Sequence, residues 1–301
     1  MTIAVGFKCV DGVVLAADSL YTEGTAKLYG QKIFPIDSNG HYALTIAGAG
    51  GVPSMKGIVR EIKKRLDRIG PKPADVSRIQ SVIESALCAY YPKHIDSAPT
   101  DTQGDLGVQL LVGIWTSGDG ARLFETCRTS AFEIDDHRCI GLGSHLAQYL
   151  NDVFFPPGSP PSVRLAESLA AYIVKQSKRY MQYCGGRTFV RALLDDGTDE
   201  RVRSEEIRDS EEYFEDFFKS LGRMRASRRD ADGSGHRHGP FRQDSQRPHH
   251  RTPGQTGTLP RHARGEATAL TRLSLLTPHP PAPRSPEKTT RAEILPPPSL
   301  A

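Results

Sequence analysis

The chain has 301 residues, of which 38% are hydrophobic and 25% charged, with a formal net charge of +4. Residues 225–301 hold twelve Arg and one Lys against six acids, which leaves residues 1–224 close to −3. The positive net charge of the whole chain therefore does not indicate nucleic-acid binding by residues 1–224. No apolar stretch nears the roughly 18 residues of a membrane span, and no signal peptide precedes the first strand, so we expect a cytoplasmic protein without a membrane partner.

The cysteine and histidine patterns argue against a disulfide framework and against a zinc-type metal site. The cysteines are odd in number and form no CxxC pair, which favours reduced thiols over a disulfide framework. The histidines of the second part are scattered without Cys partners or ligand spacing, so a metal site of the zinc type is not expected there. Nothing in the sequence predicts a cofactor.

Hydrophobic periodicity places strands in the first 47 residues. A run that alternates at period two ends in a polar turn at Asp11-Gly12, and a second run, residues 13–17, leads into Asp18-Ser19. A third strand opens at Lys32, and a fourth, residues 42–47, runs into glycines at 48, 50 and 51. Two helices are predicted next, over residues 53–69 and 74–91.

The remaining elements return in the same alternation. Strands are predicted over residues 106–115, 121–127, 129–134 and 137–140, then helices over 144–153 and 161–183. A strand over 187–194 and an acidic helix over 204–221 close the pattern. This order favours the α+β class, as a four-layer αββα sandwich of two antiparallel sheets between helix layers.

The composition changes near Arg225 and predicts a domain boundary. Residues 1–224 form the predicted domain, and Arg, Pro, His, Gly and Ser dominate residues 225–301, where apolar periodicity stops. Two interpretations stay open for residues 225–301: a disordered tail, or a segment translated from a non-native reading frame.

Thr2, behind the initiator Met1, is the first candidate for chemistry. Loss of Met1 would give Thr2 a free α-amine with a reference pKa of about 8, on the same residue as its hydroxyl. Such a residue carries both a nucleophile and its base, so acyl transfer needs no histidine.

Four elements in order give the chain a family resemblance. Thr2, the Ala-Ala-Asp-Ser run ending at Ser19, Lys32-Ile33, and the Thr-x-Ala-Gly run ending at Gly48 all have counterparts. With them the chain resembles the proteasome β-subunit family of N-terminal nucleophile hydrolases, nearest to the bacterial threonine peptidase that partners an ATP-driven unfoldase. The resemblance extends in diluted form to about residue 221.

The resemblance implies a role for each matching residue. Lys32 supports the Thr2 alkoxide, Asp18 pairs with Lys32, and the Gly48 amide faces the oxyanion. The main chain at Thr22 and Gly50 pairs with an extended peptide or unfolded-protein substrate. Each signal has a simpler alternative: a turn cap for Asp18, a solvated lysine for Lys32, and a helix-start glycine for Gly48.

The match breaks around the threonine amine. Leu142 and Met181 stand where the family commonly has a serine and an acid, and neither side chain can exchange a proton. The unfoldase-linked branch also lacks the acid and carries a cysteine at the place of Cys184. In that branch loop carbonyls hold a monovalent ion, which would correspond here to a loop at Met181, Cys184 and Arg187.

Two functions therefore stay open. One is a threonine endopeptidase or amidohydrolase in a homo-oligomeric ring, with a possible ATP-dependent unfoldase partner. The other is a catalytically silent assembly subunit of the same fold. For the ring contacts we expect helix faces that include Ile58, Ile62 and Ala171.

The terminal segment gives a first prediction. Deleting residues 225–301 should leave the melting temperature and the oligomer mass, counted in subunits, almost unchanged, because the segment buries little apolar surface. Light scattering and thermal melts of the full and truncated chains measure both. Loss of assembly on truncation would show that the segment is structural.

Overall fold

The computed structural model describes residues 3–23, 26–38, 40–69, 75–100, 106–155 and 158–233; the side chains of 23, 37, 38 and 221–233 are not described. Its strands are β1 Ile3–Lys8, β2 Gly12–Asp18, β3 Leu20–Glu23, β4 Ala26–Tyr29, β5 Ile33–Ser38, β6 Tyr42–Gly50, β7 Val108–Thr116, β8 Gly120–Cys127, β9 Ser130–Ile134, β10 His137–Gly141, β11 Thr188–Leu194 and β12 Asp199–Arg201. Its helices are α1 Val52–Leu66, α2 Val76–His94, α4 Ser144–Phe154, α5 Val163–Tyr180 and α6 Ser204–Gly233.

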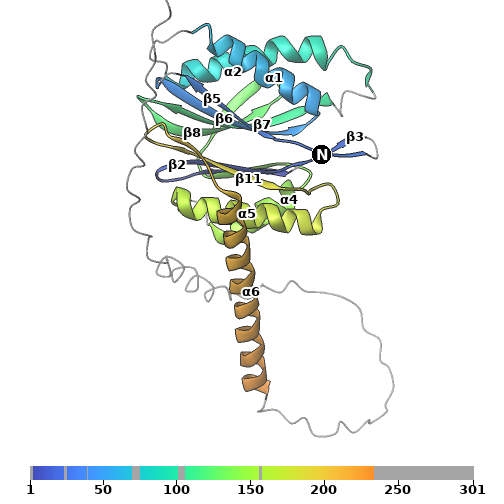
Figure 1. The fold of residues 1–301 in the computed structure, drawn as a ribbon, viewed down its shortest axis with the longest axis vertical. Coiled ribbons are helices and arrows are strands. Elements are labelled where there is room, and N and C mark those ends of the chain that lie inside the picture. The colour runs from blue at the N-terminus through green and yellow to red at the C-terminus, as the bar shows by residue number, and fades with distance from the viewer. Residues whose placement is uncertain are drawn as a thin grey trace, which may run out of the picture. The chain divides into compact units, whose positions relative to one another are not determined.

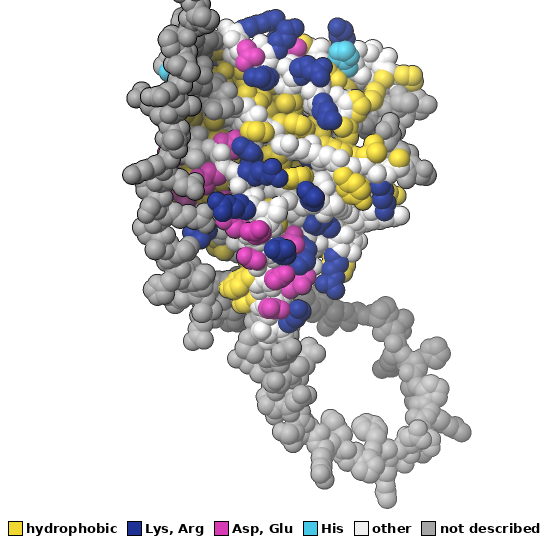
Figure 2. Space-filling view, in the orientation of Figure 1, with side chains coloured by type: hydrophobic (Ala, Val, Ile, Leu, Met, Phe, Trp, Pro, Cys, Tyr) yellow, Lys and Arg dark blue, Asp and Glu magenta, His cyan; other side chains and the backbone are white. Residues whose placement is uncertain are grey.

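These elements form the predicted four-layer αββα sandwich (Figure 1). One antiparallel sheet has the strand order β10-β1-β2-β11-β12, and the other has the order β5-β6-β7-β8-β9. Helices α1 and α2 cover the second sheet, while α4 and α5 cover the first (Figure 1). Lys and Arg side chains are spread over the visible face of the molecule, the α1 layer included (Figure 2).

Small side chains let the two sheets approach each other. Ala4 and Ala17 of the first sheet face Ala43 and Leu111 of the second in one buried cluster. A Cβ on Gly6 would lie 3.0 Å from a methyl of Leu15, so this position has no room for a larger residue. Both faces of each sheet are thus covered, which explains why β2 and β6 are buried almost throughout and their sequences read as nearly continuous apolar runs.

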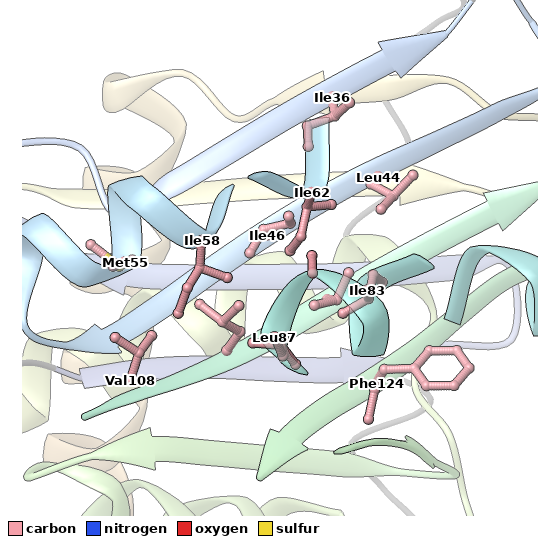
Figure 3. Packing of buried hydrophobic residues seen from close by; sticks show 14 of the residues in the cluster. Ile36, Leu44, Ile46, Met55, Ile58, Ile62, Ile83, Leu87, Val108 and Phe124 are labelled. Carbon is pink, nitrogen blue, oxygen red and sulfur yellow. The ribbon is translucent and has the colours of Figure 1, made fainter. Parts of the chain in front are cut away.

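The helix α1 packs on its sheet through one apolar stripe. Met55, Ile58 and Ile62 recur at helical spacing, and all three are fully buried against β6, β7 and α2 (Figure 3). Ala171 on α5 is equally buried in the core of the opposite layer. The expectation that Ile58, Ile62 and Ala171 contact neighbouring subunits is therefore wrong, because the fold of a single chain already covers them.

Several element bounds differ from the sequence prediction. The acidic helix does not end at residue 221 but continues to Gly233, through a stretch of Arg and Ala that favours helix. Its predecessor α5 ends at Tyr180, three residues earlier than predicted. The boundary at residue 224 and the terminal segment remain predictions, since residues 234–301 lie outside the described part. Within that part, no helix is long and apolar enough to cross a membrane.

Burial of the α1 stripe gives a stability prediction. Ile62→Ala should lower the free energy of unfolding by about 2–5 kcal/mol, because it leaves a cavity among fully buried neighbours. Leu165→Ala, at a side chain that is 43% exposed, serves as the control and should cost less than about 0.5 kcal/mol. Urea denaturation followed by circular dichroism measures both; equal losses would contradict the packing of α1.

Candidate active site

A buried ion pair joins the two sheets at one end of the sandwich. Lys32 Nζ lies 2.6 Å from Asp18 Oδ1, and both side chains are 0% exposed. Asp18 ends β2 in the first sheet, whereas Lys32 directly precedes β5 in the second. Two buried charges are stable only when they are paired and hydrogen-bonded, so neither residue is a solvated surface charge.

Backbone amides from two distant segments complete the surroundings of the Asp18 carboxylate. The N–H of Ile3 donates to Oδ1 over 3.2 Å, and the N–H of Gly185 donates to Oδ2 over 2.9 Å. Thr2 itself lies outside the described residues. Its peptide bond to Ile3 nevertheless includes the amide that Asp18 binds, so the ion pair lies next to the residue that follows Thr2.

Lys32 is enclosed by groups that favour a cation. Besides Asp18, its ammonium donates to the carbonyl of Leu20 and lies 4.9 Å from the ring centroid of Tyr21. Burial nevertheless lowers the pKa of Lys32, and the Asp18 charge opposes that shift only in part. For a lysine whose folded pKa lies below its unfolded value, the contribution to stability rises with pH between those two values.

The loop after α5 packs against the same carboxylate. Gly185 accepts hydrogen bonds from the N–H groups of Ser19 and Leu20, and the Arg187 N–H donates to Ser19 Oγ over 2.8 Å. Cys184 is buried, and burial raises the pKa of its thiol to about 11, so it is a neutral packing group here. The Met181 carbonyl accepts a hydrogen bond from the Cys184 N–H. The monovalent-ion site expected at this loop remains a prediction.

The two predicted glycines lie at the end of β6, close to the ion pair. The Gly48 N–H donates to the Lys32 carbonyl over 3.1 Å, so it continues the sheet and does not face an open cleft. Amide directions alternate along a strand, which puts the Gly50 N–H on the same edge, beyond the start of β5. Gly50 has φ +117°, a conformation that excludes most other residues.

Thr22 is a member of a separate two-stranded sheet. It lies in β3 opposite Lys27 of β4, and β3 follows directly on the Asp18-Ser19 turn. One edge of β3 is therefore taken by β4.

The sequence misses two groups that the fold brings to the site. Tyr21 covers the Lys32 ammonium, and Gly185 binds Asp18 from 167 residues away. The Gly185-Gly186 pair is a visible signal of a tight turn, but nothing in the sequence connects it to Asp18. Leu142, one of the apolar replacements, is 45% exposed beside Gly143, and Gly143 packs against Ile3 and Cys184.

The ion pair generates a prediction on stability. Lys32→Met should cost about 3–5 kcal/mol of unfolding free energy, because the buried Asp18 charge loses its lysine partner. Adding Asp18→Asn removes that charge, while its single carbonyl oxygen keeps an acceptor for one of the Ile3 and Gly185 amides. The double variant should therefore be more stable than Lys32→Met alone in urea denaturation. Additive losses would contradict a directly coupled pair.

Comparison with known proteins supports the fold. The family model of the proteasome subunit matches residues 2–159. Similar solved structures are Anbu (ancestral beta-subunit) from Yersinia bercovieri and the Anbu complex from Pseudomonas aeruginosa, both 16% identical to this chain, with TM-scores of 0.60 and 0.61. Both alignments cover 73% of this chain, and they cover 95% and 96% of the respective relatives. At that identity they establish the fold alone, and no curated protein sequence matches. Because the family match spans more than half of its length, the chain belongs to the proteasome subunit family.

Proposed function

We propose that this chain is a threonine-type amidohydrolase that cleaves peptide bonds, with Thr2 as the nucleophile after removal of Met1. The observation that carries the proposal is the position of the Lys32–Asp18 pair. It holds a buried ammonium beside the backbone amide that directly follows Thr2. A buried cation at that point stabilises negative charge on a neighbouring oxygen more strongly than a solvated one would.

The chemistry then needs few groups. The Thr2 hydroxyl attacks the substrate carbonyl, and its proton passes to the free α-amine of the same residue. The amine returns that proton to the leaving amide nitrogen as the tetrahedral intermediate collapses to an ester on Thr2. Water, activated by the same amine, hydrolyses the ester. Lys32 lowers the cost of the alkoxide, and Asp18 fixes the lysine.

Substrate binding is assigned to the edges of β3 and β6. A peptide in extended conformation would add as a strand between the main chain at Thr22 and that at Gly50. The Gly48 N–H, which now donates to the Lys32 carbonyl, would exchange that acceptor for the substrate oxyanion. The substrate class is a peptide or an unfolded-protein segment, because main-chain pairing reads no particular side chain.

Assembly into a homo-oligomer is part of the proposal. The related protein of Pseudomonas aeruginosa is described as a helical assembly of the Anbu complex. A closed ring, an ATP-dependent unfoldase partner and a cytoplasmic location are further predictions from the resemblance.

A catalytically silent assembly subunit is the second candidate function. Two observations favour it: the Gly48 amide is already hydrogen-bonded, and Leu142 and Met181 offer no side-chain proton acceptor. The two candidates differ in one property, the reactivity of Thr2.

A covalent probe separates the candidates. A peptide epoxyketone should add one inhibitor mass to the tryptic peptide that begins at Thr2, because the probe reacts with a hydroxyl and an amine on one residue. Peptide mapping by mass spectrometry locates the adduct. Thr2→Ala should abolish labelling, and Thr2→Ser, which keeps both groups, should retain part of it.

Two other labelling results would count against the proposed nucleophile. Labelling that persists in Thr2→Ala would place the nucleophile elsewhere and contradict the proposal. A wild-type chain that is folded but never labelled would favour the silent subunit.

A further inference from the structure

Helix α1 carries a row of cations on its outer face. Lys56, Arg60 and Lys64 follow one another at i, i+4 and i+8 and are all exposed. Like charges at this spacing repel one another and destabilise a helix. Among the described residues, other charges of α1 form ion pairs, Lys63 with Asp67 and Arg65 with Glu61, but these three do not. The row therefore destabilises the helix, and within the part of the chain that the structure describes no acidic side chain pairs with it.

The cationic row lines one side of a groove of about 530 Å³ between α1 and α2, together with Glu61, whose carboxylate is paired with Arg65. The other wall is aromatic: Tyr90 and His94 lie with their ring centroids 4.4 Å apart. Gly57 allows Tyr90 to approach α1 closely, since a Cβ there would lie 2.4 Å from its hydroxyl oxygen. Such a groove fits an apolar ring flanked by carboxylates.

Helix α6 presents that combination of groups. Glu205, Asp209, Glu212 and Asp216 are exposed and, at i, i+4, i+7 and i+11, lie along one line of the helix. Tyr213 lies beside this acidic row and is 54% exposed. The inward carboxylates Glu211 and Glu215 pair with lysines of α5. Within the acidic row Asp216 pairs with Lys219, whereas Glu205, Asp209 and Glu212 form no ion pair among the described residues.

A single chain cannot bring the two rows together. α1 lies in the outer layer on the second sheet, whereas α6 packs on α5 at the opposite side of the sandwich (Figure 1). We propose that the acidic row of α6 docks in the α1–α2 groove of a second copy of this chain, with Tyr213 between the cationic and aromatic walls. The cationic row is about 12 Å long and the acidic row about 16 Å, so their lengths match.

This contact is heterologous, because it joins different surfaces of the two copies. Repeating it generates a ring if the rotation closes and a helical filament if it does not. The contact goes beyond the proposed function, since it needs neither Thr2 nor Lys32. A failure of Thr2 labelling would leave it untouched, and its own failure would leave the proposed catalysis untouched.

Charge reversal in the full chain tests the contact. One variant carries Lys56→Glu, Arg60→Glu and Lys64→Glu; another carries Glu205→Lys, Asp209→Lys and Glu212→Lys. Each should lose the species heavier than a monomer in sedimentation velocity at micromolar concentration, at least a two-fold drop in weight-average mass. The chain with all six changes should recover the wild-type mass, because the attraction is restored with reversed signs.

A matched control holds the charge change constant. Lys27→Glu, Arg122→Glu and Arg179→Glu alter exposed cations on other elements and should keep the wild-type mass. A monomeric wild type, loss of mass in the control, or no recovery in the six-fold variant would overturn the proposal. The proposal would also be overturned if reversing the α6 row lowered the weight-average mass and reversing the α1 row did not. The acidic row would then contact another segment of the second copy.

Discussion

The ion pair between Lys32 and Asp18 is the constraint on which the site depends. It connects the end of β2 in one sheet to the start of β5 in the other, with both side chains fully buried. A pair of this kind adds little net stability compared with apolar packing, but removing one partner is costly. Its position therefore suits a functional role: it fixes an ammonium at the point where β1 begins and where Gly185 binds from 167 residues further along the chain.

The rest of the fold positions that pair. Alanines and Gly6 between the sheets allow their close approach, and the apolar stripes of α1 and α5 cover the outer faces. Both strand ends that carry the charges are consequently held by neighbours on each side. The aromatic ring of Tyr21 and the turn at Gly185 then exclude water from the charges, which strengthens their field at the start of β1.

Local patterns were sufficient to predict much of this arrangement. Alternation in residues 3–17 and the i, i+4 spacing of Ile58 and Ile62 predict the elements, and their order predicts the sandwich. The motif residues Asp18 and Lys32 indicate the site through the family resemblance, in which an acid ends one strand and a lysine precedes another. The sequence could not show that the Gly48 N–H donates a hydrogen bond to the Lys32 carbonyl, because this contact depends on the register between β5 and β6. Nor could spacing reveal that Ile58 and Ile62 face α2 and not a neighbouring subunit, since a buried stripe and an interface stripe have the same pattern.

The central claim is that Lys32 and Asp18 serve a free N-terminal threonine. Intact-mass spectrometry of the purified protein, combined with N-terminal sequencing, tests it most directly. The purified chain should lack Met1 and begin at Thr2 with an unmodified α-amine. A chain that retains Met1, or carries an acyl group on Thr2, would have no free amine on Thr2 to accept the hydroxyl proton, and Thr2 could then not act as the nucleophile in this way.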